Sequence, residues 1–179
     1  MPEYKTADLE TLRGHIAGTL LEVLFDHWSA RCEELGRVPA QGEIDPAAMK
    51  PALQNLVIAN FDEDRDDYHV RLAGSSVREM LKLELTGRYL KDIYDAGFAA
   101  NLVQQYHEVR LTRRPHLMRL VAALDSRKPY CFHRLLLPLE GDAVIGCGYV
   151  QTHIDHLDTS LVEMARKRTS LSGYLVNLN

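Results

Sequence analysis

Hydrophobic side chains between residues 8 and 35 recur at steps of three and four, which is the period of an amphipathic helix. Thr6 or Asp8 can cap the start of this helix, and Gly36 stands where a left-handed C-cap is expected. The apolar stripe must be buried, either against the protein's own sheet or against the same helix of a second subunit. Its members are Leu9, Leu12, Ile16, Leu20, Val23, Leu24, His27 and Trp28.

The pattern then changes from helical to β period. An N-cap followed by proline predicts a short helix over 45–53. Two β-rich runs, 55–61 and 68–73, flank an acidic turn and predict a hairpin. In the second run, alternation places three side chains on one face: Tyr68, Val70 and Leu72.

The second half of the chain predicts helices followed by strands. A short helix should end near residue 83, and 99–112 has one apolar helical side before Pro115. Three strands follow over 116–124, 130–139 and 143–152, and then a helix over 157–168. This order predicts an α+β fold: a five-stranded antiparallel sheet with helices packed on one face and the long N-terminal helix available to cover the other.

The length fits one domain built from three segments. We expect an N-terminal helix over 1–38 for packing or dimerisation, a core over 39–153, and a C-terminal helix and tail over 154–179. A chain of 179 residues buries enough surface to fold without a disulfide or a structural metal. Its 46% hydrophobic and 26% charged residues are ordinary for a globular protein.

Charge and cysteine usage restrict the partners and the compartment. A net charge of −4 disfavours nucleic acid, because binding phosphates requires a basic face. Cys32, Cys131 and Cys147 are an odd number without a CxxC spacing, as in reduced cytoplasmic proteins. The chain shows no secretory signal and no apolar run near the ~20 residues that span a bilayer. We therefore expect a cytoplasmic protein that binds neither membranes nor nucleic acid.

Several short motifs, in this order and spacing, resemble those of a known family. They are Phe25-Asp26-His27-Trp28 with Arg31, Ile44-Asp45-Pro46, Tyr68 to Gly74, Leu85-Thr86-Gly87-Arg88-Tyr89-Leu90, and Arg134 to Leu139. The chain is similar over residues 24–148 to short bacterial PAS-like proteins, mostly from alphaproteobacteria. The resemblance implies a PAS-like fold and a sensory or regulatory role. It implies no catalytic set, and the cofactor stays unknown.

Two glycines within a predicted strand mark a candidate ligand pocket. Gly146 and Gly148 are placed where another group can approach the backbone closely. If Gly141 and Asp142 alone form the preceding turn, these glycines share a face with three residues of the neighbouring strand: His133, Leu135 and Leu137. The 99–112 helix would close this pocket through Tyr106. The alternative is that a side chain or the helix itself fills the space.

Other candidate chemistry is weaker. His153, Asp155, His156 and Asp158 are zinc-type ligands, but they lack the convergent set that a site needs. Haem binding would require an axial ligand, and the candidate is His107, a lone histidine on the predicted 99–112 helix. No cysteine lies on a mid-domain helix, where flavin photochemistry requires one. Two strand arginines, Arg71 and Arg134, can either bind a ligand carboxylate or pair with an acidic neighbour.

These observations favour binding over catalysis. We expect a stand-alone sensory module that binds a small molecule or a regulatory protein and signals by association, and that is not an enzyme. The candidate homodimer interface is the N-terminal stripe at Leu9, Leu12, Ile16, Leu20, Val23 and Trp28. A ligand-free interaction domain is the alternative. An enzyme would need an acid–base pair, for example His133 with an Asp or Glu, and the sequence places no such residues at a convincing spacing.

Overall fold

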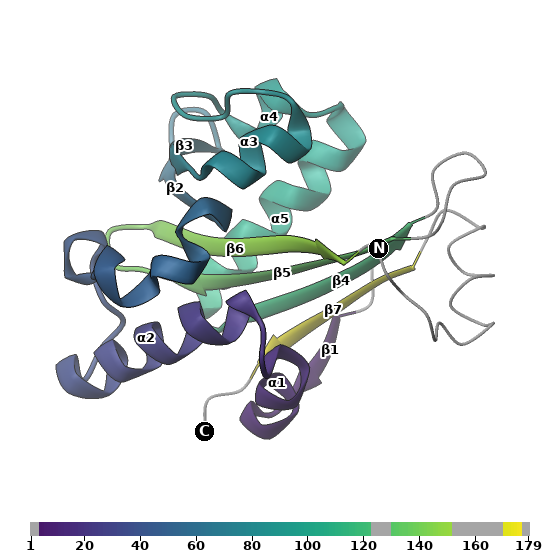
Figure 1. The fold of residues 1–179 in the computed structure, drawn as a ribbon. Coiled ribbons are helices and arrows are strands. Elements are labelled where there is room, and N and C mark those ends of the chain that lie inside the picture. The colour runs from purple at the N-terminus through teal and green to yellow at the C-terminus, as the bar shows by residue number, and fades with distance from the viewer. Residues whose placement is uncertain (1–3, 123–129, 152–169, 177–179) are drawn as a thin grey trace.

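One seven-stranded sheet, in the order β1-β7-β4-β5-β6-β2-β3, organises the chain (Figure 1). The computed structural model describes residues 4–122, 130–151 and 170–176. The strands are β1 (Tyr4–Ala7), β2 (Leu56–Asp62), β3 (Asp67–Ala73), β4 (His116–Ala122), β5 (Tyr130–Pro138), β6 (Ala143–Gln151) and β7 (Ser170–Val176). The helices are α1 (Leu9–Ile16), α2 (Leu20–Leu35), α3 (Ser75–Leu81), α4 (Leu90–Ile93) and α5 (Ala96–Thr112), with the 3₁₀ segments η1 (Gln41–Glu43) and η2 (Pro46–Asn55).

The five strands predicted from the sequence form the antiparallel core of this sheet. β4, β5, β6, β2 and β3 are consecutive neighbours, and each pair is antiparallel. β7 adds to β4 in antiparallel fashion, and β1 adds to β7 in parallel. The prediction treated 170–176 as a tail, but this segment contributes a strand to the sheet. The helix predicted over 157–168 lies outside the described residues.

The predicted single N-terminal helix is wrong, because the chain breaks it at Gly18. This glycine has a φ of +70°, in the left-handed region that favours glycine. The Thr19 hydroxyl then caps α2 by accepting the Leu21 N–H at 3.2 Å. The predicted caps at the two outer ends are confirmed, since Asp8 caps α1 and Gly36 ends α2 with a φ of +66°. The result is two shorter helices with a bend between them.

The N-terminal apolar stripe is buried against the protein's own sheet, so its prediction as a free interface is wrong. Leu12, Ile16 and Trp28 are at most 1% exposed. They pack with sheet residues such as Leu135 and Leu137 in one hydrophobic core. The remaining predicted interface residues are partly buried against the same core: Leu9, Leu20 and Val23. The sheet offers a nearby apolar face within the same chain, so these side chains do not need a second subunit to leave water.

The opposite face of the sheet carries α3, α4 and α5 (Figure 1). Tyr68 and Val70 of β3 point into this second core, as the alternation predicted. Leu72 does not, because the β2–β3 register shifts between Ile58 and Ala59 and leaves Arg71 as the extra residue. Leu72 is therefore opposite Ile58 and is 42% exposed. The predicted common face for Leu72 is wrong for this reason.

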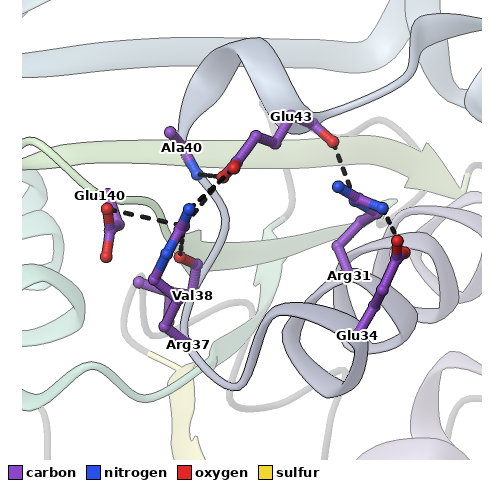
Figure 2. Close-up of polar contacts among 7 residues, drawn as sticks. All are labelled: Arg31, Glu34, Arg37, Val38, Ala40, Glu43 and Glu140. Carbon is purple, nitrogen blue, oxygen red and sulfur yellow. Dashed lines mark hydrogen bonds and ion pairs between the residues drawn. The ribbon is translucent and has the colours of Figure 1, made fainter.

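The segment after α2 is fastened to the β5–β6 turn by charged side chains (Figure 2). Arg37 donates two 2.8 Å hydrogen bonds to the Glu43 carboxylate and lies 3.6 Å from Glu140. Glu43 also accepts the Ala40 N–H at 2.7 Å. These bonds, led by those from Arg37, lower the pKa of Glu43 to about 2. The network is solvated, so it orients this segment more than it stabilises the fold.

Candidate functional site

The predicted pocket residues lie on two opposite faces of the sheet. Gly146 is opposite Leu136, and Gly148 is opposite Arg134. Both glycines therefore face α5 and Tyr106, as predicted. The three residues that were predicted to share this face lie on the opposite face: His133, Leu135 and Leu137. The predicted grouping is wrong by one residue of register. The loop contains Glu140 as well as Gly141 and Asp142, because Leu139 rather than Glu140 is bonded to Ala143. One extra residue in this turn shifts the pairing of β5 with β6 by one position, so each β5 side chain lies on the face opposite to the one predicted relative to β6.

Side chains occupy the space that the two strand glycines leave. A Cβ added at Gly146 would lie 2.7 Å from Leu136 Cδ2 and 4.0 Å from the Tyr106 hydroxyl. A Cβ added at Gly148 would lie 2.9 Å from the ring of Phe132. Each glycine is thus explained by close packing of a neighbouring side chain, which is the alternative that the sequence left open.

Arg134 supplies the charged group on the α5 face. Its side chain is half-buried, and Nη2 donates to the Gln105 side-chain oxygen and lies 3.8 Å from the Met118 sulfur. Gln105 and Met118 are 3% and 5% exposed, and the guanidinium carbon lies 5.9 Å from the centre of the Tyr106 ring. Arg71, the other arginine considered from the sequence, is exposed on β3. Only Arg134 of these two arginines is placed between the sheet and the covering helix.

The positive charge of Arg134 acts on its buried neighbours. Burial, reinforced by Arg134, lowers the pKa of His116 to about 3, so this imidazole is neutral at physiological pH. Burial raises the pKa of Tyr94 to about 12 and also raises that of Tyr106, and in both cases Arg134 opposes the increase. His116, Tyr94 and Tyr106 are therefore uncharged at neutral pH. Burial of a cation beside neutral side chains strengthens its interaction with an anion.

The C-terminal half of α5 is held at the tips of two hairpins. His107 Nε2 lies 3.3 Å from Asp66 of the β2–β3 turn, and its Nδ1 lies 3.2 Å from the Tyr68 hydroxyl. One helical turn later, Arg110 lies 3.3 Å from Asp142 of the β5–β6 turn and stacks 3.9 Å above the Phe61 ring. Both ring nitrogens of His107 thus have partners within the chain, so the histidine that the sequence raised as a haem ligand has a structural role.

We expect His107 to remain neutral until the pH falls below 6.5. Burial lowers its pKa, Arg110 and Lys91 lower it further, and Asp66 opposes them. Because the pKa of His107 is lower in the folded state than in the unfolded state, its contribution to the free energy of unfolding is complete above pH 6.5. This contribution is lost as the pH falls through the folded-state pKa. Below pH 6.5 the wild type should therefore lose stability more steeply than His107→Gln. Urea unfolding at several pH values, with NMR titration of the imidazole, checks this. A His107 pKa at or above 6.5 would contradict it.

Metal and thiol chemistry find little support in the described residues. They contain no cluster of three or more His, Cys, Asp or Glu side chains that could hold a metal ion. The candidate ligands His153, Asp155, His156 and Asp158 lie outside these residues. Cys131 and Cys147 are buried and free, and burial raises the pKa of Cys147 to about 12, so its thiolate is suppressed.

A protein-family model for the PAS domain matches residues 18–147. The chain belongs to the PAS domain family. No match was found among the curated proteins. None was found among the solved structures either. The family agrees with the five-stranded antiparallel sheet and its helices, and it supports a sensory or interaction module. In the described part of this PAS domain, no helix is long and apolar enough to cross a membrane.

The motifs that carried the family resemblance in the sequence mainly build the fold. His27 accepts the Asp45 N–H at 3.0 Å, and Trp28 donates to the Pro138 carbonyl at 2.9 Å. Gly87 and Arg88 exchange 2.8 Å backbone hydrogen bonds with Val70 and so cover part of the β3 edge. These residues dock α2 and protect the sheet, which explains why the motifs predicted the fold and left the ligand open.

Proposed function

We propose that this PAS domain is a cytoplasmic sensory or regulatory module that binds a small molecule on the α5 side of its sheet, beside Arg134. Occupancy would be transmitted to a regulatory protein through α5, the helix that covers the site. The half-buried guanidinium of Arg134 carries the proposal. A strand cation and the polar Gln105 beside a mainly apolar helix–sheet interface are the kind of polar contacts that fix a ligand in a mainly hydrophobic site.

The placement of α5 supports a relay role. Its N-terminal part begins beside Tyr94 and Phe98, whose rings lie 4.8 Å apart, while its C-terminal part is held by the Asp66–His107 and Arg110–Asp142 pairs. A ligand that repositions Arg134 also acts on Gln105, which lies midway along this helix. The helix is thus anchored at its C-terminal end and is contacted in its middle by the proposed ligand-binding residue, which supports a role in transmitting occupancy.

A ligand-free interaction domain is the second candidate. The observation that favours it is the packing of Leu136 and Phe132 into the spaces at Gly146 and Gly148. Either function is one of binding. Asp66, His107 and Tyr68 form a chain like that of an acid–base relay, but the terminal Tyr68 is 0% exposed. A hydroxyl without solvent access supports a role in packing, and we propose no catalytic step. Leu12, Ile16 and Trp28 lie in the core, so these side chains are not available to form a homodimer interface.

Native mass spectrometry of freshly purified protein tests the proposal. Wild type and the control Arg71→Gln should retain an adduct that disappears under denaturing conditions. Arg134→Gln should lose it, because a hydrogen bond to a charged group contributes about 1.5–3 kcal/mol, or about 10–100-fold in affinity. An absorption spectrum of the same samples would show any coloured ligand. Equal retention by Arg134→Gln would contradict the proposed site, and bare chains in all three samples would favour the ligand-free interaction domain.

A further inference from the structure

A row of three polar side chains crosses the sheet on the face opposite Arg134. Arg119 of β4 is paired with His133 of β5, and His133 is paired with Tyr149 of β6. The rings of His133 and Tyr149 stack in parallel, with centroids 4.9 Å apart and planes 5° apart. Tyr149 packs at the margin of the core formed with α1 and α2. The row therefore lies where that hydrophobic core ends.

His133 holds a buried polar atom that its surroundings do not satisfy. The residue is 7% exposed, and Nε2 has no hydrogen-bond partner within the described part of the chain. The nearby Gln151 side chain raises the pKa of the same imidazole, but Nε2 still has no hydrogen-bond partner among the described residues. A buried nitrogen left without a partner costs free energy, so such an atom in a folded protein calls for a water, an ion or a ligand.

The α1–α2 bend lies beside this row. Thr19, the N-cap of the 16-residue helix α2, lies close enough to Tyr149 for its hydroxyl to lower the pKa of that side chain. The N-terminus of such a helix carries a partial positive charge and favours an anion. Glu22 already accepts the Gly18 N–H at 2.7 Å, so one backbone donor of the bend is occupied. The bend at Gly18, which replaced the predicted continuous helix, is what brings this helix end to the sheet.

Basic groups surround His133. Burial lowers its pKa, Arg119 and His15 lower it further, and Gln151 opposes them. Arg119 and His15 also have other interactions in the structure, so they do not depend on a ligand for a partner. His15 and Gln151 are exposed and Arg119 is half-buried, while the Nε2 atom of His133 is shielded from water, so an anion would have to displace neighbouring side chains to reach it. The cluster concentrates positive charge around an unsatisfied nitrogen.

We propose that Arg119, His133 and His15, together with the N-terminus of α2, form a binding site for a small oxyanion, a phosphate or a carboxylate. The anion would accept a hydrogen bond from protonated His133 Nε2 and would be attracted by the positive charge of Arg119. This site is distinct from the Arg134 site, since positions 133 and 134 of β5 point to opposite faces. It goes beyond the proposed function and does not rest on it. Anion binding there would link the position of α1 and α2 to the sheet.

Binding at this site is expected to take up a proton. An opposite charge within about 4–6 Å favours protonated histidine, so a bound oxyanion should raise the pKa of His133 by about one unit or more. By linkage the affinity increases as the pH falls, because the protonated form is the one that binds. His107 is a control within the same molecule, since it lies on the opposite face and should not respond.

NMR titration of the histidine side chains tests the site. Sodium phosphate and sodium acetate are added separately to the full-length protein at a constant ionic strength set with sodium chloride. Saturable shifts at His133, with an increase of its pKa, are expected with one or both anions. Response to phosphate alone identifies a phosphate site, and response to acetate as well identifies a carboxylate site. Arg119→Gln should weaken the response about tenfold or more, whereas Arg71→Gln, on an exposed strand position, should not.

Three results would overturn the site. They are an unchanged His133 pKa with both anions, an equal shift with chloride alone, and an undiminished response in Arg119→Gln. Backbone NMR spectra establish that both variants are folded before they are compared. If Arg119→Gln does not fold, the His133 pKa of the wild type in phosphate against chloride still decides the question. None of these results depends on whether Arg134 binds a ligand, so the two sites can fail separately.

Discussion

Trp28→Ala is expected to lower the free energy of unfolding by about 3–5 kcal/mol, the usual cost of truncating a large buried aromatic side chain. Trp28 is 1% exposed and lies between α2 and the sheet, where the centres of its ring system and of the Phe25 ring are 6.0 Å apart. Its indole N–H also donates to the Pro138 carbonyl at 2.9 Å, which joins α2 to the end of β5. Truncation therefore leaves a cavity and an unsatisfied buried carbonyl at the same position.

Trp28→Phe separates these two contributions. Phenylalanine keeps much of the apolar contact but cannot donate to Pro138, so a loss of about 1–3 kcal/mol is expected. Urea unfolding followed by far-UV circular dichroism measures both variants, because Trp28 is the single tryptophan and its removal abolishes the fluorescence signal. A loss below about 1 kcal/mol for Trp28→Ala would show that α2 is not docked through this residue.

Gly74→Ala is expected to destabilise the fold by about 2–3 kcal/mol or to prevent folding, because the new methyl group has no space. A Cβ at this position would lie 2.3 Å from the Gln54 carbonyl oxygen and 2.6 Å from that of Leu53. Both are backbone atoms, which cannot rotate away as a side chain can. The φ of Gly74 is −67°, which any residue adopts, so the cost is steric and not conformational.

Gly14→Ala is the matched control and should have the opposite sign. Gly14 lies inside α1, and a Cβ there would meet no atom within 4 Å. Alanine in an open helical position favours the helix by about 1 kcal/mol over glycine. Thermal unfolding of the two variants beside the wild type should therefore give midpoints on either side of it. Equal effects of the two substitutions would contradict the packing described at Gly74.

Local rules predicted the elements because their causes are local. The Asp8 cap, the Gly36 C-cap and the β2–β3 hairpin each depend on residues a few positions apart in the chain. The alternation of Tyr68 and Val70 was correct for the same reason and failed at Leu72, where a bulge intervenes. Bulges arise from pairing with another strand, so the period of a single strand does not reveal them.

The candidate site depended on register and was predicted only in part. Tyr106 and both strand glycines were placed on the correct face, but a three-residue turn in place of a two-residue turn exchanged the partners on β5. Arg134 was noted from the sequence as a possible carboxylate ligand, and its position opposite Gly148 is the signal that a correct register would have revealed. His133 was assigned to the pocket and instead lies in the cluster with Arg119.

The sequence by itself determined the five core strands in their order along the chain, the ends of the N-terminal helical region and membership of the PAS domain family, because propensity, caps and motif spacing are written along the chain. The tertiary structure decided which faces those elements present. Gly18 could have continued or broken the helix, and packing of Leu12 and Trp28 against the sheet selects the bend. The two proposed sites depend on strands distant in sequence being brought into one register, which is a property of the assembled sheet.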